Sequence, residues 1–231
     1  MFIYGLHPVL NFIKYKRNIV KKVYCNQEIY RKYIKDIYKN AIIVDNREIK
    51  KIVNLDEHQG LIAEISHFPY IDFYESLKKS NIICILDHIE DPRNLGAIIR
   101  NALAFKIDLV VIPKKRACEI NSTVIKASAG SAAIVPISMV KNINNAIRDL
   151  KENDFWVYGL EVTGNKALSN VVFDSKVAVV LGSEGKGIHE LTKKLCDHLI
   201  YIETEKNVSS LNVSSASAIV FYKIYSQYYV A

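Results

Sequence analysis

Three polar segments follow apolar stretches of the chain, and each contains residue types that can bind or orient a small molecule. They are LDHIEDPRNLGAIIRNA (86–102), VAVVLGSEGKGI (177–188) and IYIETEKNVSSLNVSSASA (200–218). Among them they carry two amides, a guanidinium, a carboxylate and a hydroxyl: Asn94, Asn212, Arg100, Glu184 and Ser210. Such groups can position a substrate and stabilise charge that develops during a reaction.

The first segment runs from an apolar strand into an acidic turn. Pro92 fixes φ near the start of a helix, and Asn94 can either cap this helix or hold a ligand. Asp87 and Asp91 are readily explained as parts of a capped turn. Arg100 is different, because a permanently charged guanidinium close to a strand end can grip a phosphate or a ribose.

The second segment is a glycine-rich turn with Glu184 inside it. Only two residues separate Gly182 from Gly185, and no Ser or Thr follows Lys186, so the turn is not a nucleoside-triphosphate loop. It is not a G-x-G-x-x-G turn either, which argues against a nicotinamide dehydrogenase. A tight structural turn and a ligand site, which the backbone approaches closely at glycine, both stay open.

The third segment predicts a strand, a polar loop and a helix beginning near Ser209 or Ser210. Its first helical turns are rich in Ser and Ala, which permit close packing. An ordinary capped helix would explain the pattern. If the SSLN stretch lies beside the other two segments, it could instead form part of a ligand cradle.

The elements that position these segments are apolar, β-rich runs that alternate with helix-like stretches. The runs are 82–86, 109–112, 156–160, 177–181 and 199–202. This alternation predicts an α/β fold with a parallel sheet, which binds ligands at the carboxyl ends of its strands. Between the first two runs, an apolar stripe formed by Leu95, Ile98, Ile99, Ala102 and Leu103 predicts an amphipathic helix over 95–105.

The first 66 residues have a separate pattern, with a helix over 7–16 and strands at 22–25, 41–44 and 60–65. We therefore predict a small α/β domain (1–66), a linker with or without a short helix (67–80) and a larger domain (81–231).

Positive charge is concentrated in the first domain. Residues 1–66 contain twelve Lys and Arg against seven Asp and Glu, a net +5 of the chain's formal +7. Interleaved tyrosines could stack on bases, so we predict RNA contacts here, with Lys14, Lys16 and Arg17 as candidates. The basic turn Lys114, Lys115 and Arg116 is a second candidate, although a solvated helix face or loop would show the same charges.

The four cysteines lie far apart, with no C-x-x-C pair and no His at ligand spacing. We expect reduced, buried thiols and no metal. The start MFIYGLHPVL lacks the features of a signal peptide, and no apolar run is long enough to span a membrane, so we expect a cytoplasmic protein with no membrane partner.

Taken together, the three segments resemble the signature motifs of the SpoU branch of the SPOUT methyltransferases in order, spacing and residue type. IPKKRACEINSTVIKASAGSA (112–132) continues the match. IYGLHPV (3–9) and HQGLIAEI (58–65) look like the accessory domain of the 23S rRNA guanosine 2′-O-methyltransferases. The resemblance thus covers nearly the whole chain.

The resemblance implies a SPOUT-type parallel sheet with a carboxyl-terminal trefoil knot, preceded by a small RNA-binding domain, in a homodimer. It implies S-adenosylmethionine as cofactor, with contacts to Leu181, Gly182, Gly185, Ile202 and Leu211. The reaction centre would comprise Asn94, Arg100, Glu184, Ser210 and Asn212. The family usually has I-P-M-x-G before S-L-N, whereas Ile202 is followed here by Glu203, Thr204, Glu205 and Lys206.

The implied reaction moves a methyl group from S-adenosylmethionine to a ribose 2′-hydroxyl, with an rRNA guanosine favoured over a tRNA. Arginine stays protonated in proteins, so we expect Arg100 to stabilise the developing alkoxide rather than to act as a base. Ser210 and Asn212 would orient the ribose, and Glu184 would hold Arg100 or its own loop. Two alternatives remain: the same reaction on tRNA, and an RNA-binding protein without activity.

Overall fold

The computed structural model describes residues 1–205, 207 and 210–230, and the chain divides into two compact units. The first unit comprises Met1–Pro69 with Ile120–Ile134, and the second comprises Tyr70–Glu119 with Val135–Ala231. Residues 120–134 thus pack with the first unit, whereas the sequence placed them in the larger domain. There, Lys126 donates hydrogen bonds to the Gln59 side chain (3.0 Å) and to the Glu57 carbonyl (3.2 Å).

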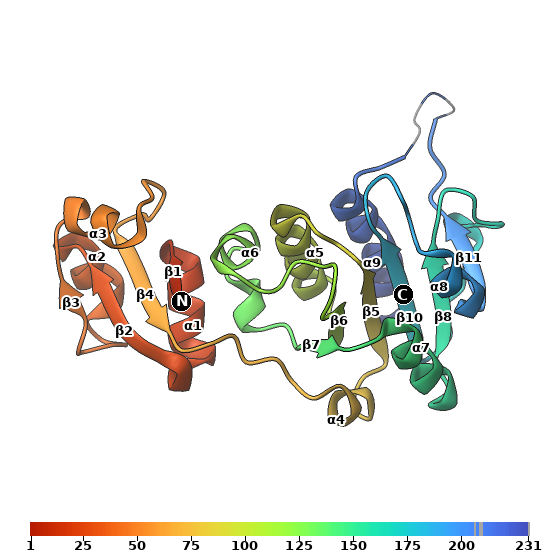
Figure 1. Cartoon of the computed structure of the whole chain (residues 1–231), viewed down its shortest axis with the longest axis horizontal. Coiled ribbons are helices and arrows are strands. Elements are labelled where there is room, and N and C mark those ends of the chain that lie inside the picture. The colour runs from red at the N-terminus through yellow and green to blue at the C-terminus, as the bar shows by residue number, and fades with distance from the viewer. Residues whose placement is uncertain (206, 208–209, 231) are drawn as a thin grey trace. The chain divides into compact units, whose positions relative to one another are not determined.

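The first unit is built on a four-stranded sheet in the order β1-β4-β2-β3 (Figure 1). Its strands are β1 (Phe2–Tyr4), β2 (Val20–Cys25), β3 (Ile42–Ile43) and β4 (Leu61–Ile65). Its helices are α1 (Leu6–Tyr15), η1 (Arg17–Ile19), α2 (Gln27–Ile29), η2 (Tyr30–Ile34), α3 (Asn46–Val53), α6 (Ser122–Ala127) and η3 (Ser131–Ala133). The helix and three strands expected here are present. Strand β1 and the helices between residues 27 and 53 were not expected.

The second unit contains a seven-stranded, fully parallel sheet in the order β7-β6-β5-β10-β8-β11-β9. The strands are β5 (Ile82–Asp87), β6 (Leu109–Pro113), β7 (Ile137–Val140), β8 (Trp156–Leu160), β9 (Lys166–Ala167), β10 (Val177–Gly182) and β11 (His198–Tyr201). Every residue of β5, β6 and β10 is buried, as expected for strands covered on both faces. The predicted α/β fold with a parallel sheet is confirmed.

Helices of the second unit are α4 (Phe73–Leu77), α5 (Pro92–Ala104), α7 (Ile143–Glu152), α8 (Glu190–Leu195) and α9 (Val213–Tyr229), with a 3-10 turn η4 (Leu168–Asn170). Helix α4 falls within the expected linker and buries Phe73 and Leu77 in the core of this unit. Four members of the predicted stripe on α5 are buried, but Leu103 is exposed. The expected trefoil knot stays a prediction.

Helices α5 and α9 pack on each other through small and polar side chains. Asn101 of α5 donates to the Ser214 carbonyl and to the Ser217 hydroxyl of α9, both at 2.9 Å. Ser217 is fully buried, so its small side chain allows the two helices to approach closely. This contact fixes the start of α9 relative to α5, and both helices begin beside the candidate site.

In the part of the chain that the structure describes, no helix combines the length and the apolar character needed to cross a membrane.

Candidate functional site

A pocket of about 480 Å³ lies where the carboxyl ends of β8, β10 and β11 meet. It is lined by residues 160–162, by residues 181–187, and by Ile202, Thr204, Ser210, Leu211, Asn212, Val213 and Ala216. Two of the three segments selected from the sequence therefore line one cavity. This is the edge at which open parallel sheets bind ligands.

All five residues expected to contact a cofactor line this pocket: Leu181, Gly182, Gly185, Ile202 and Leu211. The glycine turn is closed by two backbone hydrogen bonds between Ser183 and Gly187, of 3.1 and 2.9 Å. A Cβ atom on Gly182 would lie 2.1 Å from the carbonyl carbon of Gly187. Only glycine fits there. The sequence left two interpretations of this loop, a ligand site and a tight structural turn, and the structure is compatible with both because the tight turn also forms a wall of the pocket.

Asn212 links all three predicted segments. Its side-chain oxygen caps α9 by accepting from the Ser214 amide at 2.8 Å. Its amide nitrogen donates to Asn94 Oδ1 at 3.2 Å and to Glu184 Oε1. Three of the five expected reaction-centre residues thus contact one another, although the sequence separates Asn94 from Asn212 by 118 residues.

Helix α9 begins at Val213, so the prediction of a start near Ser209 or Ser210 was wrong. The cap formed by Asn212 explains the later start, because its side chain satisfies the amide of Ser214. Ser210 lies before the helix and lines the pocket. Ser209 and Lys206 lie outside the described residues.

Helix α5 begins at Pro92 and is capped by Asp91, which accepts from the Arg93 amide at 2.7 Å. Asn94 therefore does not cap this helix, which was one of its two predicted roles. Its buried side chain instead accepts a hydrogen bond from Asn212. Arg100 is exposed and absent from the pocket lining. Arg100 follows Asn94 by six positions in this helix, so it lies about 9 Å farther along the axis and on another face.

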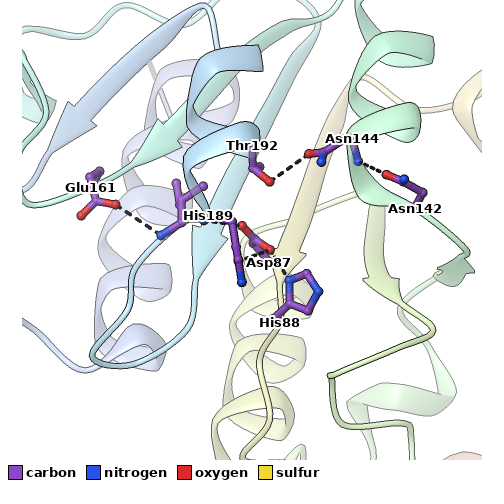
Figure 2. A network of polar contacts seen from close by, with 8 residues as sticks. Asp87, His88, Asn142, Asn144, Glu161, His189 and Thr192 are labelled. Atoms are coloured by element: carbon purple, nitrogen blue, oxygen red, sulfur yellow. Dashed lines mark hydrogen bonds and ion pairs between the residues drawn. The ribbon is translucent and has the colours of Figure 1, made fainter.

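Two carboxylates that the sequence did not single out as site residues hold the glycine turn from both sides (Figure 2). Asp87, at the end of β5, accepts the His189 amide at 2.8 Å. Glu161, directly after β8, accepts the Ile188 amide at 3.3 Å and forms an ion pair with Lys193 at 3.1 Å. The hydrogen bond that Lys193 donates to Glu161 raises the pKa of Lys193, so the ammonium group stays charged around neutral pH. Asp87 is the last residue of β5 and Glu161 directly follows β8, and these two strands flank β10. An acid at the carboxyl end of an apolar run is the sequence signal that could have identified both residues.

The stretch after Ile202, which departs from the family pattern, is held by a contact between its first residue, Glu203, and Ser169. Glu203 accepts from the hydroxyl of Ser169 and from its amide at 3.4 Å. These hydrogen bonds lower the pKa of Glu203. At the position where the family usually has proline, this chain thus has a glutamate whose side chain contacts η4. The next residue, Thr204, lines the pocket.

The candidate RNA-binding residues lie on both units. In the first unit, Lys14 and Arg17 are exposed, and Lys16 is partly buried. Arg17 stacks 4.9 Å from the ring centre of Tyr38. In the second unit, Lys114, Lys115 and Arg116 are exposed after β6.

The cysteines only partly match the expectation of buried thiols. Cys25 and Cys84 are buried, whereas Cys118 and Cys196 are half-buried because they lie in connecting segments. Burial raises the pKa of Cys25 to about 11 and that of Cys196 to about 12, so these two thiols stay protonated at neutral pH.

Comparison with known proteins agrees with this arrangement. The SpoU rRNA Methylase family matches residues 81–222, and the family of RNA 2′-O ribose methyltransferase substrate-binding domains matches residues 2–71. A TrmH family tRNA/rRNA methyltransferase of Staphylococcus haemolyticus is 36% identical, over 96% of this chain and 94% of that protein. A tRNA/rRNA methyltransferase of Synechocystis is also 36% identical, but the chain spans only 62% of its length.

Solved structures show the same fold at low sequence identity. The SpoU methyltransferase AviRb of Streptomyces viridochromogenes, solved with the cofactor AdoMet, superposes with a TM-score of 0.84 at 17% identity, covering 98% of this chain and 89% of that one. An rRNA methyltransferase of Sinorhizobium meliloti gives 0.81 at 18%, covering 100% and 88%. The extent of the family matches, together with the pocket formed by its motifs, leads to one conclusion: this chain belongs to the SpoU family of RNA methyltransferases.

Proposed function

We propose that this protein transfers a methyl group from S-adenosylmethionine to the 2′-hydroxyl of a ribose in RNA, with a guanosine of large-subunit rRNA as the favoured target. One observation carries the proposal. The hydrogen-bonded set Asn94, Glu184 and Asn212 lies at a pocket lined by all five residues expected to hold the cofactor.

The residues present fit this cofactor. Glycine at 182 brings main chain to the pocket surface, and Leu181, Ile202 and Leu211 supply apolar contacts for an adenine ring. AviRb, which shares the fold, binds AdoMet. When bound, S-adenosylmethionine supplies an electrophilic methyl group.

The chain's own contribution would be positioning and electrostatics. Displacement at an activated methyl group needs an aligned oxygen nucleophile, so orientation supplies much of the rate. We assign the orientation of the ribose to Ser210 and Asn212. Glu184, which accepts from Asn212, holds that amide and the glycine turn in place. Arg100 would stabilise the negative charge that develops on the ribose oxygen.

The homodimer is part of the proposal. Helices α5 and α9 expose Leu103, Ile219, Tyr222 and Tyr229, which a second copy could cover. Because Arg100 lies outside the pocket lining of its own chain, we infer that it acts at the pocket of the partner.

The experiment that tests the proposal is a comparison of ribose methylation across all cellular RNAs, with and without this protein. Loss of one mark at an rRNA guanosine is the expected result. Loss at a tRNA position would select the nearest rival, which the relatives' names leave equally open. No lost mark, combined with no binding of S-adenosylmethionine, would favour an RNA-binding protein without activity. A cytoplasmic location belongs to the proposal.

Changing Lys14, Lys16 and Arg17 to glutamine should weaken RNA binding and make it less sensitive to salt. Each lost phosphate contact lowers the slope of log affinity against log salt by about one. The measurement is fluorescence anisotropy with an rRNA fragment at several salt concentrations. Lys50→Gln is the matched control, because Lys50 is engaged by Asp56 at 2.6 Å in the same unit. Equal slopes for the triple variant and the control would contradict the assignment.

A further inference from the structure

We propose that Asp87, His88 and His189 form a binding site for a divalent transition metal ion, with zinc as the best match to their chemistry. The three residues lie in the second unit, at the carboxyl end of β5 and directly after the glycine turn (Figure 2). None of them lines the candidate pocket. The proposal is therefore independent of the proposed function.

The potential ligand atoms already converge. One oxygen of Asp87 lies 3.0 Å from Nδ1 of His189 and also contacts Nδ1 of His88. One potential ligand atom from each of the three residues lies within 4.8 Å of the other two, and the imidazole ring centres are 4.4 Å apart. Ligand atoms around a tetrahedral zinc ion, with bonds of about 2.0 Å, are separated by about 3.3 Å. Small side-chain rotations would thus make room for an ion.

Charge favours a cation at this position. The side chain of Asp87 is completely buried, and within the described residues its ion-pair partners are only the two histidines. Its second oxygen accepts the His189 amide at 2.8 Å. A buried carboxylate needs compensating positive charge, which neutral imidazoles do not supply. A bound divalent ion would supply that charge.

The donor set indicates the class of metal. Two imidazole nitrogens and one carboxylate oxygen suit zinc and its neighbours, whereas magnesium and calcium prefer oxygen ligands alone. The side chains of His88 and His189 are 24% and 47% exposed, so solvent can reach the site and a water can complete the coordination. The expectation of no metal rested on the absence of a C-x-x-C pair and of a histidine at ligand spacing in the sequence. This cluster instead joins two histidines that are about a hundred residues apart in the sequence.

The site would reinforce a contact that the fold already makes. Asp87 ends β5, and His189 follows the turn that leaves β10, so an ion would tie these two segments together by side chains as well as by the existing backbone hydrogen bond. Because the ion binds only the folded chain, it should raise the unfolding temperature.

The test uses the full-length protein after removal of metals with a chelator. We expect calorimetry with zinc to give one ion per chain, and cobalt to give the intense visible absorption of a four-coordinate site. Zinc should also raise the midpoint of thermal unfolding. Binding well below one ion per chain, or a cobalt spectrum without four-coordinate bands, would overturn the proposal.

Substitutions of single histidines distinguish zinc binding at this cluster from zinc binding to other histidines of the chain. His88→Gln and His189→Gln should each weaken zinc binding at least tenfold and remove the thermal shift. The matched control is His198→Gln, since His198 stacks on Trp156 outside the cluster. If the cluster variants bind zinc as tightly as the control, the site does not exist. These variants keep Asp87 and its buried hydrogen bond to the backbone, so we expect them to fold, and thermal unfolding without zinc checks this.

Discussion

Gly182→Ala is expected to lower the affinity for S-adenosylmethionine at least a hundredfold. The new methyl group would lie 2.1 to 2.3 Å from backbone atoms of Gly187 and Ile188, which are held in place by the Ser183 hydrogen bonds and by Glu161. Backbone cannot yield as a flexible side chain can, so the turn must open and the pocket wall must move. Isothermal titration calorimetry with S-adenosylmethionine measures the loss.

The matched control for this prediction is Gly185→Asn in the same turn. A Cβ on Gly185 would meet nothing within 4 Å, and asparagine tolerates the positive φ of 78° better than most residues do. We expect its affinity to stay within about tenfold of wild type, a change of about 1.4 kcal/mol. Thermal unfolding of both variants separates a local change from global unfolding. A folded Gly182→Ala protein with native affinity would show that the cofactor binds elsewhere.

The sequence was most informative where local pattern and burial act together. The five predicted runs all became strands of one sheet, because continuous apolar stretches such as Val177–Gly182 have no polar face to expose and must be covered on both sides. Parallel pairing then brought their following loops to one edge. The segments that line the pocket could therefore be selected in advance without knowing the order of the strands. The individual cofactor contacts, from Leu181 to Leu211, were implied by the resemblance to the SpoU family.

What the sequence did not predict depends on contacts between distant residues. Strand β9 has two residues and exists only through its pairing with β11. The start of α9 is set by Asn212, and the sequence offered nearby serines as equally good caps. Asp87 resembled an ordinary turn residue until the fold placed it against His189, 102 positions away. Side chains of this kind acquire their role from tertiary structure alone.

Arg100→Ala is expected to lower the rate of methyl transfer by about 10² to 10³-fold, the usual effect of removing one donor that stabilises a developing oxyanion. The affinity for S-adenosylmethionine should stay unchanged, because Arg100 does not line the pocket. Arg100→Lys should recover part of the rate, since it keeps the charge but loses the planar fork. Single-turnover methylation of an rRNA fragment measures the step directly. An alanine variant with the native rate would refute the assignment.

A mixture of two inactive variants tests whether Arg100 acts at its own pocket or at that of a partner. Asn212→Ala removes the residue that joins Asn94, Glu184 and α9, while Arg100→Ala leaves that set intact. If Arg100 reaches across the dimer, a mixed dimer contains one pocket with a native Asn212 and a native Arg100 from the other chain. Equal, freely exchanging mixtures would then recover about a quarter of the wild-type activity. If Arg100 serves its own pocket, each site of the mixed dimer lacks one residue and no activity returns.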